Sequence, residues 1–485
     1  MSHLLSIDPN EPAPKPDSFQ ARVQAADALA DAAPGPDDLA ALYHTGGTTG
    51  LPKLLPHSHR NEVHTSRCAP AYYDFRAGDC MFNGFPLFHV AGAFVYGLSC
   101  LARGGSLLLP TLTGMRDPAF VARAWQWFGQ VGVSHLGCVP TVLSALLAAP
   151  RAGGVPATLR VAMSGGSPLP NELALRFERE IGVPVRNIFG MTESAGLVSI
   201  EPVGAPRSAG SVGLRLPYTE VIAVPRATVE ALTPEANTFA VAAARAGTPS
   251  RCPELDERQA DDPARLAQAT GVIAMRGPHV SRGYLDAARR LGTFTDDGWL
   301  LSGDLGHVMR DGRIVLSGRA KDVIIRSSHN IDPGLIEDAV MAHPSVAAAA
   351  AVGEPDAYAG ELPVVFVLPK PGERIDADEL ARAIAQTIAE PPAVPKRVTV
   401  LEQMPMTAIG KIYKPALRVR AAQQKLDEIV ARVAPDADLG VDVTEAPGGV
   451  AVAVRFGAGV DAPVRARVRA ALGELAVPAR FDEAG

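Results

Sequence analysis

The chain has 485 residues, which at roughly 150 residues per domain allows about three compact units. Hydrophobic residues make up 47% and charged residues 20%, a globular balance that excludes a largely disordered chain. The 46 Lys and Arg against 52 Asp and Glu give a net charge of −6 without long blocks of either sign, which argues against a nucleic-acid-binding surface. The five cysteines are odd in number and lack C-x-x-C spacing. We therefore expect reduced thiols in a cytoplasmic protein rather than a disulfide framework or zinc ribbon.

No membrane span or leader is expected. The longest uninterrupted apolar stretch, residues 90–102, has 13 residues, whereas a spanning helix needs about 20. The first residues carry no basic region and soon become acidic and proline-rich, so no secretory signal is predicted.

From residue 39 onward, apolar strands alternate with amphipathic helices, the pattern of an α/β fold. The expected strands are 40–44, 106–110, 133–139, 159–164 and 183–189, and the expected helices include 118–130 and 171–180. Between residues 224 and 269 the periodicity is lost. An irregular connection that long is uncommon inside a compact domain, so this stretch is an insertion, a disordered loop or corrupted coding sequence.

The pattern resumes with strands at 271–276, 312–316 and 322–325, and Asp332-Pro333 is expected to open a helix. Strands at 346–352, 362–368 and 398–401 and a helix at 376–389 then predict a small α+β unit. Beyond residue 425, runs at 439–444 and 449–456, a helix at 462–475 and a last strand predict a β-β-α-β appendage. We expect domains at 1–317, 318–425 and 426–485.

The strongest local motif is Tyr43-His-Thr-Gly-Gly-Thr-Thr-Gly-Leu-Pro-Lys53. Glycines let backbone N–H groups approach an anion, hydroxyls add donors and the lysine supplies charge, which together suit a polyphosphate. The spacing is not that of a P-loop. A flexible Gly/Thr turn is the alternative interpretation of this motif alone.

A second motif, Asn187-Ile-Phe-Gly-Met-Thr-Glu193, follows an expected strand. Its aromatic residue beside a glycine can stack on a purine, and Glu193 offers the hard oxygen that magnesium prefers. Read alone, the segment is more typical of a strand end with a capping threonine.

Two further segments carry charged groups in turns. Asp304 follows a glycine, and Gly318-Arg319-Ala-Lys321-Asp322 comes shortly after it; the carboxylate can accept from two ribose hydroxyls and the arginine can donate. Lys411 stands on a turn ahead of a helix. Taken singly, these are a turn acid, a surface ion pair and a solvated lysine.

Together, in this order over residues 43–414, the motifs resemble those of the AMP-forming adenylating enzymes, the family of acyl-CoA synthetases, luciferases and peptide-synthetase adenylation domains. The resemblance implies a large multi-sheet α/β adenylating domain followed by a small mobile lid. It also implies ATP, Mg²⁺ and CoA as cofactors and a carboxylic acid as substrate.

The resemblance assigns roles residue by residue. Lys411 would bridge the carboxylate and the α-phosphate, Thr192 would contact the α-phosphate region, Glu193 would hold magnesium, and His89 would gate the acyl pocket. The nucleotide-binding residues that it implies are Thr45, Gly46, Gly47, Thr48, Thr49, Gly50, Lys53, Gly165, Asn187, Phe189, Gly190, Asp304 and Arg319, with Lys321 at the lid hinge.

The sequence departs from the family pattern at four places. Gly46 replaces a frequent Ser, Phe189 replaces Tyr, and Ser328 stands where the family has a glycine near the thiol channel. If that position needs a positive φ, Ser costs roughly 1 kcal/mol or more and impairs thioester formation selectively. Only 44 residues precede Thr45, shorter than in the family, so we expect the large domain to be incomplete at its start.

The predicted function is ATP-dependent ligation of a carboxylic acid, by default an apolar one, to CoA with release of AMP and pyrophosphate. An adenylating enzyme with a non-CoA acceptor is one alternative, and a truncated, non-catalytic remnant is the other. The role of the appendage is left open.

Overall fold

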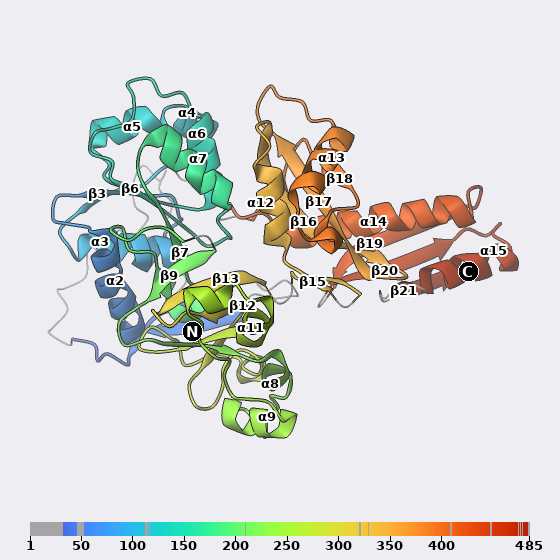
Figure 1. Ribbon diagram of the computed structural model, residues 1–485, viewed down its shortest axis with the longest axis horizontal. Coiled ribbons are helices and arrows are strands. Elements are labelled where there is room, and N and C mark those ends of the chain that lie inside the picture. The colour runs from blue at the N-terminus through green and yellow to red at the C-terminus, as the bar shows by residue number, and fades with distance from the viewer. Residues whose placement is uncertain are drawn as a thin grey trace, which may run out of the picture.

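The computed structural model describes residues 33–45, 53–111, 115, 117–208, 210–319, 322–327, 329–407, 410–446, 449–473, 475, 477 and 479–483. These residues form a two-stranded hairpin, a sheet of 11 strands, a sheet of five and a sheet of three. Figure 1 shows the large sheet with its helices beside the smaller five-stranded unit, and the three-stranded unit beyond it. Within the described ranges, no helix combines the length and apolarity needed to cross a lipid bilayer.

The first half of the large sheet is parallel, and helices cover both of its faces (Figure 1). Parallel strands need helical crossovers, which is why strands and helices alternate here. The strands are β3 (Cys80–Asn83), β4 (Ser106–Leu108), β5 (His135–Cys138), β6 (Val161–Gly165) and β7 (Val185–Phe189). The helices are α2 (His59–Tyr73), the π-helix η1 (Ala91–Leu98), α3 (Ser99–Leu101), α4 (Pro118–Ala122), α5 (Ala124–Val131), α6 (Pro140–Ala148) and α7 (Asn171–Ile181).

The second half is antiparallel and is joined to the first through β7 and β8. Its strands are β8 (Ser199–Ile200), β9 (Ser211–Arg215), β10 (Glu220–Val224), β11 (Gly271–Arg276), β12 (Leu300–Val308) and β13 (Arg313–Arg319), with the short helices η3 (Thr192–Ser194) and η4 (Ala287–Arg289) beside them. The hairpin of β1 (Leu39–Thr45) and β2 (Lys53–Ser58) packs on this half through Leu55.

Residues 226–269 form four short helices, so the expectation of an irregular stretch is wrong. They are α8 (Arg226–Glu230), α9 (Phe239–Ala246), α10 (Glu257–Ala260) and α11 (Pro263–Ala269). Each is eight residues or shorter, too short to show helical periodicity. The last three are capped at their starts by Thr238, Asp256 and Asp262. Phe239 packs with Trp299 in a buried cluster. The helix expected at 118–130 is likewise divided, at Arg123.

The smaller unit contains β14 (Ile324–Arg326), β15 (His329–Ile331), α12 (Pro333–Met341), β16 (Val346–Asp356), β17 (Gly360–Pro369), α13 (Ala377–Thr387), η5 (Pro391–Ala393) and β18 (Val398–Val400). Asp332 caps α12 by accepting the Gly334 N–H at 2.9 Å, as the sequence predicts. We call residues 322–413 the lid. The expected boundary after residue 317 falls within β13.

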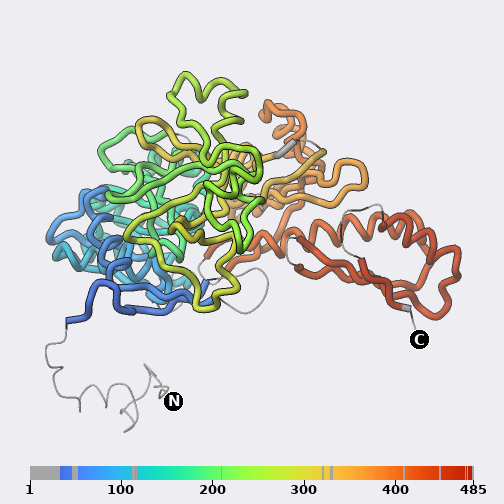
Figure 2. The backbone as a smooth tube through the Cα atoms, turned by 90° about the horizontal axis from the view of Figure 1, so that it is seen from below, coloured from blue at the N-terminus to red at the C-terminus, as the bar shows by residue number. Residues whose placement is uncertain are grey.

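The C-terminal unit follows the predicted β-β-α-β order. The 20-residue helix α14 (Lys414–Val433) leads into β19 (Leu439–Ala446), β20 (Gly449–Phe456), α15 (Ala462–Gly473) and β21 (Ala479–Glu483). We call residues 437–483 the appendage; it projects away from the rest of the molecule in Figure 2. The expected boundary after residue 425 falls inside α14.

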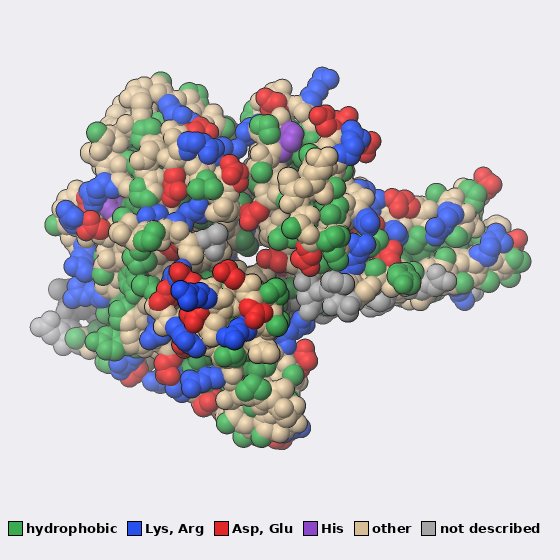
Figure 3. Space-filling view, in the orientation of Figure 1, with side chains coloured by type: hydrophobic (Ala, Val, Ile, Leu, Met, Phe, Trp, Pro, Cys, Tyr) green, Lys and Arg blue, Asp and Glu red, His purple; other side chains and the backbone are tan. Residues whose placement is uncertain are grey.

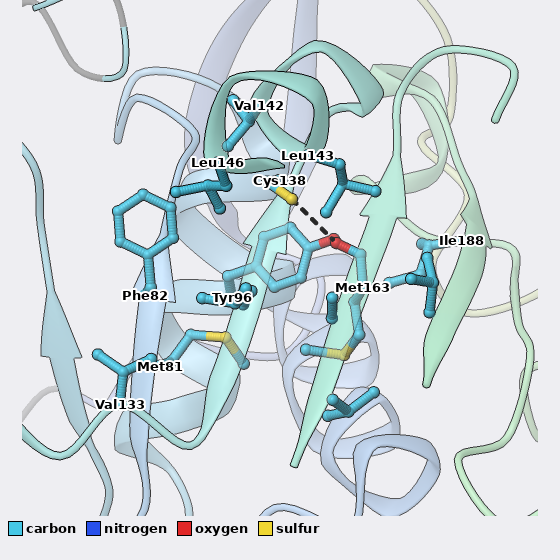
Figure 4. Packing of buried hydrophobic residues seen from close by; sticks show 14 of the residues in the cluster. Met81, Phe82, Tyr96, Val133, Cys138, Val142, Leu143, Leu146, Met163 and Ile188 are labelled. Carbon is cyan, nitrogen blue, oxygen red and sulfur yellow. Dashed lines mark hydrogen bonds between the residues drawn. The ribbon is translucent and has the colours of Figure 1, made fainter. Parts of the chain in front are cut away.

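Side chains of both charge signs are intermixed over the face in Figure 3, and a notch at the top of this view lies between the outer parts of the lid and of the parallel half. The main core lies in the parallel half, where β3, β5, β6 and β7 pack against α6 (Figure 4). There the Cys138 thiol donates to the Met163 carbonyl at 3.8 Å. All five cysteines are free thiols.

Candidate active site

The ends of the first glycine-rich motif are fixed by a hairpin. Thr45 and Lys53 are opposite each other in the β1–β2 pair, and Thr45 is buried. Lys53 Nζ lies 4.6 Å from the centroid of the Tyr284 ring. The loop itself, with Gly46, Gly47, Thr48, Thr49 and Gly50, lies outside the described residues, so its predicted phosphate contacts stay a prediction.

Glu193 lies on η3, directly after β7, and only 7% of it is exposed. The Tyr284 hydroxyl donates to Glu193 Oε1 at 2.5 Å. Burial, followed by the charge of Glu193, raises the pKa of Tyr284, so its hydroxyl remains a donor. Tyr284 therefore touches both Lys53 and Glu193, which the sequence motifs place 140 residues apart along the chain.

Two interactions hold the hairpin against the second motif. His57 Nε2 donates to the Thr192 carbonyl at 2.8 Å, and the Tyr43 ring stacks on His57 with centroids 5.3 Å apart. Burial lowers the pKa of His57 to about 4, which keeps the imidazole neutral at pH 7. The backbone of Thr192 is thus fixed by a histidine that the sequence motifs did not include.

The strand that precedes Glu193 is held by polar contacts of Asn187. Its side-chain amide donates to the Ser211 carbonyl at 3.1 Å, and its N–H donates to the Glu201 carboxylate at 2.9 Å. Phe189 is 7% exposed and packs in the cluster that includes Leu55. The predicted contacts of Asn187 and Phe189 with adenine stay predictions.

Gly190 and Gly165 allow close backbone approach. A Cβ atom on Gly190 would lie 2.1 Å from the Gly196 carbonyl oxygen, and one on Gly165 would lie 2.8 Å from the Ile188 carbonyl oxygen. Both distances are shorter than a van der Waals contact. These two predicted glycines therefore bring β6, β7 and the turn with Glu193 together.

Lys411 reaches from the lid to the carboxyl end of β6. A Cβ atom on Gly166, where φ is +80°, would lie 3.1 Å from Lys411 Cε and 3.4 Å from its Nζ. The neighbouring carbonyl of Gly410 accepts a hydrogen bond from Thr141 Oγ1, at the start of α6, at 2.8 Å. The predicted lysine is thus held over the parallel half of the large sheet.

His89 lies beside Lys411 in a stack of rings. Phe85 is stacked on His89 at 5.8 Å and on Tyr96 at 5.5 Å. Burial, then the positive charge of Lys411, lowers the pKa of His89 to about 4, so it is neutral at pH 7. Lys411 also lies near the ring on which His89 stacks, because a Cβ atom on Gly166 would lie 3.1 Å from Lys411 Cε and 3.5 Å from Phe85 Cε1.

Asp304 and Arg319 occupy opposite positions on β12 and β13. Asp304 is 7% exposed, and its N–H donates to Ser302 Oγ at 3.0 Å. Lys321 and Ser328 lie outside the described residues. The structure therefore places Asp304 and Arg319 opposite each other on neighbouring strands. Their contacts with the ribose stay a prediction.

These groups fit a magnesium–polyphosphate ligand beside a carboxylate. Lys53 and Lys411 supply cations, Glu193 supplies a hard oxygen, and the buried Ser164 hydroxyl next to Gly165 has no hydrogen-bond partner among the described residues. No cluster of three or more metal-ligating side chains occurs in the described ranges. A magnesium ion at Glu193 would therefore complete its shell with phosphate and water oxygens, as this ion commonly does.

Two known families of protein domains match parts of this chain. The AMP-binding enzyme family matches residues 2–285, and the AMP-binding enzyme C-terminal domain matches residues 335–411. The first match covers more than half of the chain, so the chain belongs to the AMP-binding enzyme family.

Among similar curated proteins, marinolic acid–CoA ligase of Pseudoalteromonas sp. (strain SANK 73390) is 33% identical over 413 residues, covering 84% of this chain. This chain spans 59% of that relative's length. Sulfoacetate–CoA ligase of Cupriavidus necator is 32% identical over 79% of this chain and 67% of its own.

Among solved structures, ATP-bound MatB from Rhodopseudomonas palustris matches with a TM-score of 0.66 and 27% identity over 82% of this chain and 72% of its own. The anthranilate CoA ligase AuaEII, in complex with anthranoyl-AMP, matches in fold with a TM-score of 0.69 at 22% identity, over 84% of this chain and 72% of its own. The predicted adenylating α/β fold with a small C-terminal domain is confirmed.

Proposed function

We propose that this protein is an ATP-dependent acid–thiol ligase. A carboxylate oxygen attacks the α-phosphorus of ATP, and the bond to pyrophosphate breaks, giving an acyl-adenylate. The sulfur of CoA then attacks the acyl carbon, the thiol proton is lost to water, and AMP leaves. The observation that carries the proposal is the placement of Lys411 against Gly166 and beside His89.

In the first step, negative charge builds on the α-phosphate oxygens. Lys411 would stabilise that charge and orient the attacking carboxylate, and Thr192 would donate to the same phosphate. Glu193, oriented by Tyr284, would hold magnesium. When bound, magnesium neutralises phosphate charge and helps pyrophosphate to leave.

The remaining nucleotide contacts follow from the motifs. The loop from Thr45 to Lys53 would bind the β- and γ-phosphates, Asn187 and Phe189 would flank adenine, and Asp304 and Arg319 would bind the ribose. Lys321 would act as the hinge about which the lid turns to withdraw Lys411 and admit CoA. The resemblance of Lys321 to the family's hinge residue supports that last role.

We place the acyl group beside His89 and assign it an apolar character. The rings of Phe85, His89 and Tyr96 next to Lys411 support this choice, because aromatic faces favour apolar ligands. The five free thiols favour a reducing compartment such as the cytoplasm.

The test is to follow pyrophosphate release with a panel of carboxylic acids, with and without CoA. Acid-dependent release with formation of acyl-CoA is expected. Adenylate without thioester, even with CoA, would indicate another acceptor. If ATP with magnesium fails to raise the melting temperature, the proposed function is wrong.

Lys411→Ala provides the matched test of mechanism. Because Lys411 stabilises charge only in the first step, adenylation should fall about a hundredfold or more. The reaction of supplied acyl-adenylate with CoA should change little. Equal losses in both steps would contradict the role of Lys411.

A further inference from the structure

Helix α14 belongs to two units at once. Its first half, with Leu417 and Ala421, packs in a lid cluster against β16 and β17. Its second half, with Leu426 and Ile429, packs against the appendage strands β19 and β20. Lys411 stands three residues before the start of this helix. The position of Lys411 therefore depends on a helix whose packing the lid and the appendage share (Figure 1).

The lid holds the first turns of α14 by charge. Lys414 Nζ lies 2.7 Å from Glu337 Oε1 on α12, and Arg418 pairs with Asp322, next to the proposed hinge residue. Both pairs involve side chains that are less than one quarter exposed. The helix and the lid thus form one rigid attachment for the loop that carries Lys411.

The appendage holds the same region from the other side. Gln423, in the middle of α14, donates to the Val441 carbonyl at 3.0 Å and accepts the Val443 N–H at 3.2 Å, so it is bound to the backbone of β19. Further along β19, the carboxylate of Glu445 accepts a hydrogen bond from the Tyr413 hydroxyl at 2.6 Å. Tyr413 is only two residues from Lys411.

The Glu445–Tyr413 hydrogen bond joins charged and neutral partners, which makes it stronger than an ordinary one. Glu445 Oε1 is buried and has no hydrogen-bond partner among the described residues. The hydrogen bond from Tyr413 is therefore the polar contact that compensates this carboxylate. Losing it would leave a partly buried carboxylate, one of whose oxygens is fully buried, without this hydrogen bond, so the contact stabilises the position of Tyr413.

Tyr413 also closes the base of the loop that carries Lys411. Its N–H donates to the Pro405 carbonyl at 2.8 Å, and within the loop the Thr407 N–H donates to the Lys411 carbonyl at 2.7 Å. At the tip, Gly410 is held by Thr141 of the large domain. The loop is thus fixed at its tip by the large domain and at its base by the appendage.

We propose that the appendage positions Lys411 for adenylation, with Glu445 as the positioning residue that acts through Tyr413. This inference rests on the proposed function for its reaction, but its structural content is independent of activity. It gives the appendage a role that the sequence left open.

The test compares Glu445→Ala, Glu445→Gln and Tyr413→Phe in the full chain. Glu445→Ala and Tyr413→Phe should each lower the rate of acid-dependent ATP–pyrophosphate exchange about tenfold, below the hundredfold that a 1 Å misplacement can cost. The reaction of supplied acyl-adenylate with CoA should not change. Glu445→Gln keeps an oxygen acceptor and should retain the exchange rate.

Asp442→Ala is the matched control. Asp442 lies on the same strand, is 51% exposed and pairs with Arg455 at 2.5 Å, away from the Lys411 loop. It should leave both half-reactions unchanged. The double variant Tyr413→Phe/Glu445→Ala should be no slower than either single variant, because both remove one interaction.

Hydrogen–deuterium exchange supplies a readout that needs no activity. Amides of residues 406, 407 and 410–413 should exchange faster in Glu445→Ala than in the wild type, and Asp442→Ala should match the wild type. Unchanged exchange in Glu445→Ala, or equal loss in both half-reactions, would overturn the positioning role. A wild type that shows no ATP–pyrophosphate exchange would overturn the proposed function. The hydrogen–deuterium exchange comparison would still test whether Glu445 fixes the loop that carries Lys411.

Discussion

At the scale of single residues, Tyr284 connects the two strongest motifs. Its ring lies under Lys53 and its hydroxyl binds Glu193. No local pattern marks Tyr284, because its importance comes from contacts with residues far away in sequence. Lys53, Glu193 and Lys411 were singled out from the sequence, because each stands in a motif whose residue types suit phosphate or magnesium, and their roles stay predictions. Thr141 and His57 were not, because each acts on a backbone carbonyl brought near by folding.

Tyr284→Phe tests this connection. The variant keeps the ring under Lys53 and removes the donor to a buried carboxylate, so the free energy of unfolding should fall by about 1–3 kcal/mol. Urea denaturation measures the change. Tyr358→Phe is the control, because Tyr358 is 96% exposed. Equal stability of Tyr284→Phe and the wild type would contradict the contact with Glu193.

The pKa of His89 reports where Lys411 lies in solution. It is lowered to about 4 by burial and by the positive charge of Lys411. Removing a nearby cation favours the imidazolium, so Lys411→Ala should raise the pKa of His89 while burial keeps it below its ordinary value. NMR titration of labelled histidines, assigned with a His89→Gln variant, measures this. An unchanged pKa would mean that Lys411 lies elsewhere in solution.

Ser327 adopts a left-handed backbone conformation next to Ser328, the position at which the sequence predicts strain. Ser327 has φ +55°, in the left-handed region that glycine favours, and its N–H donates to the Ala359 carbonyl at 2.6 Å. The sequence comparison placed the lost glycine at Ser328. A left-handed residue does occur at this turn, directly before that position.

At the scale of elements, most predicted strands occur within two residues of their expected limits. The strand expected at 271–276 is β11, and the one at 449–456 is β20. Alternating apolar residues and long amphipathic helices carry this signal. The helices within 226–269 do not show this pattern, because each has only about two turns or fewer. They depend on tertiary packing, α8 and α9 around Phe239 and α10 and α11 around Leu255.

The turn after β7 depends on Gly190. A methyl group there would overlap the Gly196 carbonyl, so Gly190→Ala should lower the free energy of unfolding by about 3 kcal/mol or more. Gly204→Ala is the control, since nothing lies within 4 Å of the added Cβ atom; it should change stability by less than about 0.5 kcal/mol. Denaturant titration compares the two. Similar stabilities would contradict the tight packing of this turn.

At the scale of the whole molecule, the lid contacts the large domain through a carboxylate. Asp338 Oδ1 on α12 accepts the N–H of Asn171, the first residue of α7, at 3.2 Å. Burial raises the pKa of Asp338 to about 6, and the negative charges of Glu337 and Asp332 add to this, while the hydrogen bond from the Asn171 N–H acts in the opposite direction. No sequence pattern predicts this contact, because Asn171 and Asp338 are 167 residues apart along the chain.

Lid closure should therefore depend on pH. In this arrangement burial of Asp338 outweighs the hydrogen bond from Asn171, so the arrangement is favoured when Asp338 is protonated, fully so below the ordinary pKa of aspartate, near 4, and this preference is lost as pH rises through about 6. Asp338→Asn resembles the protonated form, so it should remain closed at pH 8 and show a weaker response to pH. Asp332, with a pKa of about 6, remains to give a residual response.

Small-angle scattering at pH 5.5 and pH 8 measures this effect. The radius of gyration of the wild type should increase with pH more than that of Asp338→Asn. Asp378→Asn, which changes an exposed acid on α13, should behave like the wild type. The same pH response in Asp338→Asn and the wild type would contradict the role of this contact.

Because α14 is shared, any rotation of the lid must carry the appendage with it. The helix has 20 residues, hence a length of about 30 Å. In the proposed cycle, a rotation of the lid would therefore displace the far end of this helix over a long distance. Tethering the appendage to a rigid support would therefore resist that displacement and slow turnover more than it slows the first half-reaction.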